Sequence, residues 1–229
     1  MKKIPFLSLL IFFVFCSEPK KNTNPKIEIF DKSIESIIDI HSEIEILADS
    51  ITLPEGPVWD KNSNSLLFVD VANNQILKWN KETGSTKFIS PGGNTGYAPN
   101  LGKGLLGPNG MVIDDEGNLI VCQHGDRRIA LIDNKESFKP NFITVVDNFN
   151  GKRLNSPNDL TIASDGSIYF TDPPFSFFDL DSYSFVDSDL RELDFSGIYK
   201  FNPNENKIIS ISKEIDVPNG LGLSPDEKY

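Results

Sequence analysis

The strongest constraint on the fold of this chain is a repeat, because four segments of the sequence align on one another. They begin at Glu55, Asn109, Asn158 and Asn219, so successive starts lie 54, 49 and 61 residues apart. Each opens with Glu or Asn, continues as a short apolar stretch and reaches a turn of Asp, Asn, Gly or Ser, and the first three return in a second β-rich stretch. This pattern is typical of β-hairpins, and a period of about 40–60 residues indicates propeller blades or a solenoid.

Each unit also has room for two outer strands, for example over residues 75–79 and 197–201. Four strands per unit is the composition of a propeller blade. We therefore expect an all-β fold, a β-propeller, with about three blades and the start of a fourth between residues 55 and 229. The motifs DDEGN (114–118) and SDGS (164–167) lack the ligand series of a calcium loop and are interpreted as hairpin turns.

Each hairpin brings two polar residues to one rim of a central channel, because side chains alternate along a strand. The three pairs are Glu55 with Asp70, Asn109 with His124, and Asn158 with Asp172. One interpretation is turn and cap chemistry, which Asn and Asp favour at strand ends. That interpretation explains poorly why the first position is Glu or Asn in all four units, since Ser, Thr, Gly or Lys would turn equally well. We therefore expect a site at the channel mouth.

The segment before the first hairpin contains two further expected elements. Ile34, Ile37 and Ile38 have the spacing of a short helical turn, and residues 44–47 resemble a strand that would close the ring by completing the last blade. His41 is placed on the surface. Cys122 is interpreted as a small core residue rather than a nucleophile.

The N-terminus has the pattern of an export signal. Lys2 and Lys3 precede an apolar run of about 12 residues that is too short to span a bilayer as a helix. Cys16 closes this run and resembles the lipidated Cys of a bacterial lipoprotein, although Phe15 departs from the small residue of that pattern. Ordinary secretion and a misassigned start remain alternatives. We expect a signal at 1–16, a tether at 17–30 and a partial propeller at 31–229. The protein is then a cell-envelope lipoprotein, or else periplasmic or secreted.

Composition excludes several classes of partner and site. The net charge is −11 and no basic run occurs beyond the extreme N-terminus, so nucleic acid would be repelled. Two Cys residues, neither in a CxxC or Cys/His spacing, exclude a disulfide framework and a zinc finger. The absence of a GxSxG motif disfavours covalent catalysis. We expect a monomer that contacts a membrane only through an N-terminal lipid.

Six motifs together resemble the gluconolactonase family, the relatives of regucalcin (senescence marker protein). They are LPEGPVW at 53–59, GPNGMVID at 107–114, CQHGDRRI at 122–129, GKRLNSPNDL at 151–160, SDGSIYFTDPPF at 164–175 and VPNGLGLSPDEKY at 217–229. The resemblance implies a six-bladed propeller that holds one divalent cation low in the channel and hydrolyses sugar lactones. Calcium is the expected ion and zinc the alternative.

The resemblance also implies roles for individual residues. Glu55 matches the first metal ligand, Asn219 the second, and Asn158 an Asn on the substrate side of the metal. Arg153 stands where the relatives have a basic residue that contacts the substrate. Asn109 occupies the same position of its repeat as Glu55, Asn158 and Asn219 do in theirs, and it is a further candidate for a substrate contact. The remaining polar residues near this rim, which could take a proton from water or orient the ligands, are Asp159, His124 and Asp172.

The family pattern has one further metal-binding Asp, the general base, in a PDG segment one blade after PNGL. This sequence stops before that segment, so we expect a truncated chain or a piece of a longer one, with a smaller closed propeller as the alternative. Three functions remain open. They are metal-assisted lactone hydrolysis, a non-catalytic binding propeller at the cell surface, and a chain that is inactive without its closing blades and base.

Overall fold

The computed structural model describes residues 27–137 and 139–229, so the proposed signal, most of the tether and Cys16 lie outside the described residues. The chain divides into two units, residues 1–46 and 47–229. In the first unit the expected helical turn is a 3₁₀-helix, η1 (Lys32–Ser36), whose N-cap Asp31 accepts a hydrogen bond from the Ser33 N–H. No helix among the described residues is long and apolar enough to cross a membrane.

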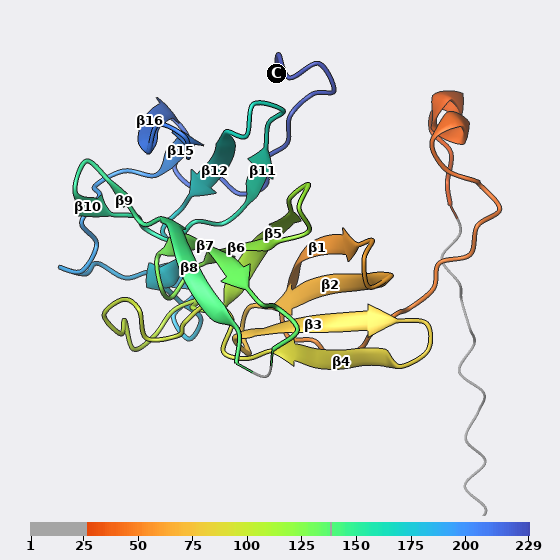
Figure 1. Cartoon of the computed structure of the whole chain (residues 1–229), viewed down its shortest axis with the longest axis horizontal. Helices are drawn as coiled ribbons and strands as arrows, with labels where there is room; N and C mark the ends of the chain where they lie inside the picture. Colours follow the sequence, from red (N-terminus) through yellow and green to blue (C-terminus); the bar gives the residue numbers. More distant parts are fainter. Residues whose placement is uncertain (1–26, 138) are drawn as a thin grey trace, which may run out of the picture. The chain divides into compact units, whose positions relative to one another are not determined.

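The second unit contains three four-stranded antiparallel sheets, each with its strands in chain order, as expected of propeller blades (Figure 1). Each sheet is one repeat unit, and the outer strands expected at residues 75–79 and 197–201 are present as the third strands of the first and third sheets. Blade 1 consists of β1 (Pro54–Asp60), β2 (Ser65–Asp70), β3 (Gln75–Asn80) and β4 (Gly84–Ile89). Blade 2 consists of β5 (Pro108–Ile113), β6 (Leu119–Gln123), β7 (Arg128–Asp133) and β8 (Asn141–Val146). Blade 3 consists of β11 (Leu160–Ile162), β12 (Ile168–Asp172), β15 (Gly197–Asn202) and β16 (Lys207–Ser212).

The expected strand at residues 44–47 is wrong, since residues 37–53 of the described chain contain no strand. An apolar pattern makes a strand only where a neighbouring strand supplies hydrogen bonds. Here Ile44 is 50% exposed and Ile46 is 82% exposed, and neither belongs to a strand.

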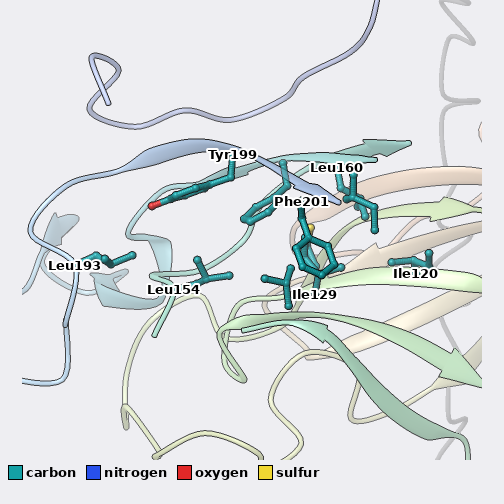
Figure 2. Packing of buried hydrophobic residues seen from close by; sticks show 11 residues of the cluster. Ile120, Ile129, Leu154, Leu160, Leu193, Tyr199 and Phe201 are labelled. Carbon is teal, nitrogen blue, oxygen red and sulfur yellow. The ribbon is translucent and has the colours of Figure 1, made fainter. Parts of the chain in front are cut away.

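Two apolar clusters hold neighbouring blades together, and blade 2 contributes to both. Along β6, Leu119 and Val121 pack toward blade 1, whereas Ile120 and Cys122 pack toward blade 3. This alternation follows from the two-residue period of a strand and leaves every residue of β6 buried. Figure 2 shows the second cluster, in which Ile120 and Ile129 face Leu160 and Phe201. Cys122 is fully buried, as predicted, and burial raises the pKa of its thiol well above the ordinary value.

Blade 3 differs from the other two in one connection. The link from the second to the third strand covers residues 71–74 in blade 1 and 124–127 in blade 2, but residues 173–196 in blade 3. This longer segment contains the 3₁₀-helix η2 (Phe175–Phe177) and the short hairpin β13 (Phe178–Asp179) with β14 (Ser184–Phe185). A second short hairpin, β9 (Asn148–Phe149) with β10 (Lys152–Arg153), precedes β11.

Candidate functional site

The first residues of the inner strands lie against one another across blade boundaries. β5 lies beside both β1 and β11. A Cβ atom added to Gly56 would lie 2.3 Å from the Asn109 carbonyl oxygen, and the Gly110 N–H donates to the Asn158 carbonyl over 2.7 Å. Neighbouring blades therefore meet at the residue that opens each repeat. We call these four opening residues the rim residues: Glu55, Asn109, Asn158 and Asn219.

This close approach explains the residue that follows each rim residue. It is Gly56 in blade 1 and Gly110 in blade 2, where a Cβ would meet backbone or carboxylate oxygen atoms at 2.3 and 2.6 Å. In blade 3 the position holds Asp159, which uses its carboxylate instead. Its Oδ2 accepts the Leu221 N–H over 3.0 Å, so it fixes the segment that carries Asn219.

Thr171 completes the attachment of Asn219. Its hydroxyl donates to the Asn219 carbonyl over 2.7 Å and accepts the Asp159 N–H over 3.2 Å. Sequence reasoning missed this residue, although its place in β12, one residue before Asp172, could have identified it as an inward polar group. Asp159 and Thr171 therefore position the backbone of the fourth rim residue.

The rim residues offer oxygen atoms with few competing partners. Glu55 is half-buried, Asn109 and Asn158 are 6% and 2% exposed, and Asn219 is exposed. Within the described part of the chain, no hydrogen bond or ion pair engages the Glu55 carboxylate or the side-chain amides of Asn109 and Asn219. The set supplies one carboxylate and three amide oxygens.

Asp70 and Asp172, at the ends of the second strands, are engaged differently. Both are fully buried. Asp70 accepts the N–H groups of Thr52 and Leu53, and Asp172 accepts those of Asn155 and Ser156 over 2.8 and 2.7 Å. Each carboxylate therefore clamps the loop that enters its own inner strand. These contacts give Asp172 a structural role, and the catalytic role expected of it stays a prediction.

The carboxyl groups of Asp70 and Asp172 differ in the direction of their pKa shifts. Burial raises the pKa of Asp172 to about 7, although its backbone donors and Arg127 oppose the shift. Burial acts in the same direction on Asp70, but the Asn73 amide and the backbone donors outweigh it, so the pKa of Asp70 is lowered.

The strand register corrects the pairing of Asn109 with His124. Pro54 pairs with Asp70 and Pro108 with Gln123, so Gln123 is the blade-2 counterpart of Asp70. Gln123 donates to the Gly92 carbonyl over 2.7 Å and accepts from Arg128 over 2.7 Å. The fifteen-residue spacing of the two pairs concealed this shift, because the turn between the paired strands is one residue shorter in blade 2, with five residues between Ile113 and Leu119 against six between Trp59 and Leu66.

His124 lies one residue further on and is fully buried. Its Nδ1 is 3.1 Å from the Leu105 carbonyl oxygen, and its Nε2 is 3.4 Å from Nδ2 of Asn158. Burial lowers the pKa of His124 to about 4, and the hydrogen bond to Leu105 acts in the opposite direction. The histidine is therefore neutral at pH 7 and lies in contact with a rim residue.

Arg153 is held outside the rim. It lies in β10, where its N–H donates to Glu192 over 2.8 Å and its guanidinium is 5.6 Å from the Tyr97 ring centre. Within the described chain no hydrogen bond joins its side chain to Asn158. The substrate contact expected of Arg153 stays a prediction.

Arg127 was missed as a structural residue although it lies in the CQHGDRRI motif. It is fully buried and donates to the carbonyls of Leu154, Leu190 and Arg153. It thereby ties blade 2 to the loops of blade 3 that flank the rim. Burial lowers its pKa to about 10.

The donor set of the rim fits a hard cation. Calcium accepts carboxylate, carbonyl and water oxygens together, whereas structural zinc sites use Cys and His. The described residues contain no group of three or more His, Cys, Asp or Glu that could hold a metal ion. That agrees with a rim of one Glu and several Asn, in which amide oxygens are most of the donors.

The sheets and the rim together define a β-propeller with polar residues at the start of its inner strands. The family model described as SMP-30/Gluconolactonase/LRE-like region matches residues 53–229. The chain belongs to this family. It is similar to a gluconolactonase of Zymomonas mobilis, with 37% identity over 206 residues, which are 90% of this chain and 55% of the relative. The chain thus spans about half the length of that relative.

Solved structures of the same fold agree. A gluconolactonase from Xanthomonas campestris aligns with a TM-score of 0.64 and 31% identity over 80% of this chain and 54% of its own. Regucalcin from Agrobacterium tumefaciens, a calcium-binding protein, aligns with a TM-score of 0.54 and 14% identity over 80% of this chain and 50% of its own. At that identity the second likeness concerns the fold alone.

Proposed function

We propose that this chain provides the first half of a divalent-metal-dependent lactonase that hydrolyses sugar lactones. The observation that carries the proposal is the rim. Glu55, Asn109 and Asn158 lie at or just before the starts of the three inner strands, and Asn219 is tied to β12 through the Thr171 hydroxyl. The family membership and the relatives named gluconolactonase support a lactonase-like function. The dependence on a metal and the sugar-lactone substrate are the parts that we add.

Glu55, Asn158 and Asn219 are the proposed ligands of one calcium ion, with zinc as the alternative. When bound, the ion would polarise the lactone carbonyl and stabilise the oxyanion that forms when water adds. Asn109 and Arg153 are the proposed substrate contacts. Asp159 supports the site indirectly, because it holds the Asn219 segment in place over 3.0 Å.

The proton acceptor is proposed to lie in a later blade, as the family resemblance implies. Among the described residues near the rim, Asp159, Asp172 and His124 are each hydrogen-bonded to other groups of the protein. We therefore propose that the complete site needs an Asp from the half of the ring that the relatives add.

The test compares the 229-residue chain with a fusion that adds the C-terminal half of the Zymomonas relative. We expect glucono-1,5-lactone hydrolysis by the fusion with calcium or zinc, loss of the activity with a chelator, and little or no activity from the chain alone. Equal turnover by both proteins would contradict the proposed base. A fusion that binds calcium and does not hydrolyse any lactone would favour a non-catalytic binding propeller.

We also propose that the protein is exported and attached to a membrane by lipid on Cys16. This rests on the sequence of residues 1–25 alone. Mass spectrometry of the mature N-terminus is the test, with Cys16→Ser as the control that should lose the lipid. An unmodified N-terminus that starts after Cys16 would refute the proposal.

A further inference from the structure

We infer that His124 is a positioning residue that turns the side-chain oxygen of Asn158 toward the channel. The inference rests on the proposed function, because it assigns Asn158 an oxygen that must face the cation or the substrate. The contacts that carry it come from three segments, the loop before β5, the β6–β7 turn and η2.

The first contact fixes where the proton of the histidine lies. Nδ1 of His124 is 3.1 Å from the Leu105 carbonyl oxygen, and a carbonyl oxygen can only accept. Nδ1 must therefore carry the proton. In the neutral ring, Nε2 is then left as an acceptor with a lone pair.

The second contact fixes the direction of the Asn158 amide. Nε2 of His124 is 3.4 Å from the end of the Asn158 side chain. An amide nitrogen can donate to that lone pair, whereas an amide oxygen would face it with a lone pair of its own. The NH₂ group therefore points to His124, and the oxygen points away from it.

The backbone that carries the ring is held by two further hydrogen bonds, and an aromatic ring packs against the imidazole. The backbone N–H of His124 donates to the Gly107 carbonyl over 3.2 Å, and its carbonyl accepts the Ser176 hydroxyl over 2.6 Å. The Phe175 ring covers the imidazole at 6.0 Å between ring centres. Ser176 and Phe175 belong to the long connection of blade 3, so that segment helps to hold the histidine in place.

Among the residues that the structure describes, Asn158 makes no other hydrogen bond that would orient its side chain. Its backbone is fixed by the Gly110 N–H and the Thr171 carbonyl, but within the described residues His124 is the hydrogen-bond partner of its amide. Removal of Nε2 leaves the amide free to turn. Partners that orient a ligand from behind in this way typically change metal affinity about 10- to 100-fold when mutated.

The test uses the full chain and two variants. In isotope-labelled protein, nitrogen NMR should show His124 neutral with the proton on Nδ1, and the Asn158 side-chain amide protons should be protected from exchange. His124→Leu should remove that protection, whereas His124→Gln should retain it, because a Gln amide can donate to Leu105 and accept from Asn158. Urea unfolding of both variants separates loss of folding from loss of orientation.

Calcium titration calorimetry gives the second readout, with the parent and both variants made in the fusion that also supplies the further Asp. We expect about 10- to 100-fold weaker binding in His124→Leu and binding within a few fold of the parent in His124→Gln. A proton on Nε2, or equal calcium affinity in all three proteins, would overturn the inference and leave the proposed function standing. A parent that binds no calcium would overturn the proposed cation, and the NMR readouts alone would then decide the orientation of Asn158.

Discussion

The two ends of each inner hairpin carry polar residues, yet the protein uses them in opposite ways. The second strands end in Asp70, Gln123 and Asp172, which are fully buried and bonded to their own loops. The first strands begin within two residues of Glu55, Asn109 and Asn158, and the fourth rim residue, Asn219, follows the last strand of the described chain. The side-chain oxygens of these rim residues have few partners among the described residues. Polar residue type alone does not separate the two sets. Their hydrogen bonds do, because a group already engaged by the backbone has little capacity left for a ligand.

The same comparison shows how the structure builds the rim. Asp70, Gln123 and Asp172, which we call the clamps, fix the loops that lead into the inner strands. Gly56 and Gly110 let those strands approach each other. Mutation of a clamp should therefore lower stability, and mutation of a rim residue should lower binding.

The largest effect is expected for Asp172→Ala. Two buried N–H groups lose their acceptor, so the free energy of unfolding should fall by about 3 kcal/mol or more. Urea unfolding measures it. Asp115→Ala, at an exposed turn residue, is the control and should stay within about 0.5 kcal/mol. A stable Asp172→Ala protein would show that this residue is not a clamp.

Asp70→Asn should have a pH-dependent effect. Because the pKa of Asp70 is lowered in the folded protein, its stabilisation is complete above the unfolded value and is lost as the pH falls below that value. At pH 7 the variant should lose about 1.5–3 kcal/mol. Unfolding curves of the two proteins should converge as the pH falls toward 3. A difference that stays constant with pH would contradict the assignment.

Gly110→Ala tests the contact between blades 2 and 3. The added methyl group would lie 2.6 Å from Asp159 Oδ1, so we expect a loss of about 1–3 kcal/mol. Gly222→Ala is a matched control, because no atom lies within 4 Å of its added Cβ. If thermal unfolding shows no difference between the two variants, the strands do not meet as closely as described.

The smallest effect on stability is expected for Asn109→Ala, which should change the free energy of unfolding by less than about 0.5 kcal/mol. Asn155→Ala is the contrasting variant, since that buried amide donates to Phe195 and accepts from Arg191, and it should cost about 1–3 kcal/mol. Similar losses in urea unfolding would remove the distinction between the rim residues and the buried side chains that hold the loops.

Much of this fold follows from the sequence, since the Glu/Asn repeat locates each inner hairpin and its turns. The sequence does not predict which polar residues at the hairpin ends hold loops and which keep their oxygens free of partners within the described chain. The one-residue shift that puts Gln123 opposite Pro108 depends on a turn that is one residue shorter in blade 2 than in blade 1. The burial of His124 depends on a loop and η2, which are distant in sequence. The strand expected at 44–47 failed because pairing requires a neighbour that a local pattern does not specify.

The central claim is that Glu55 is a ligand and not one more polar strand end. Calcium titration calorimetry tests it directly when Glu55→Gln and Glu82→Gln are each made in the fusion that supplies the further Asp. Both substitutions remove one negative charge from blade 1, and Glu82 lies in the exposed β3–β4 turn. We predict greatly weakened calcium binding in Glu55→Gln and parental affinity in Glu82→Gln. Unchanged affinity in Glu55→Gln would contradict the account.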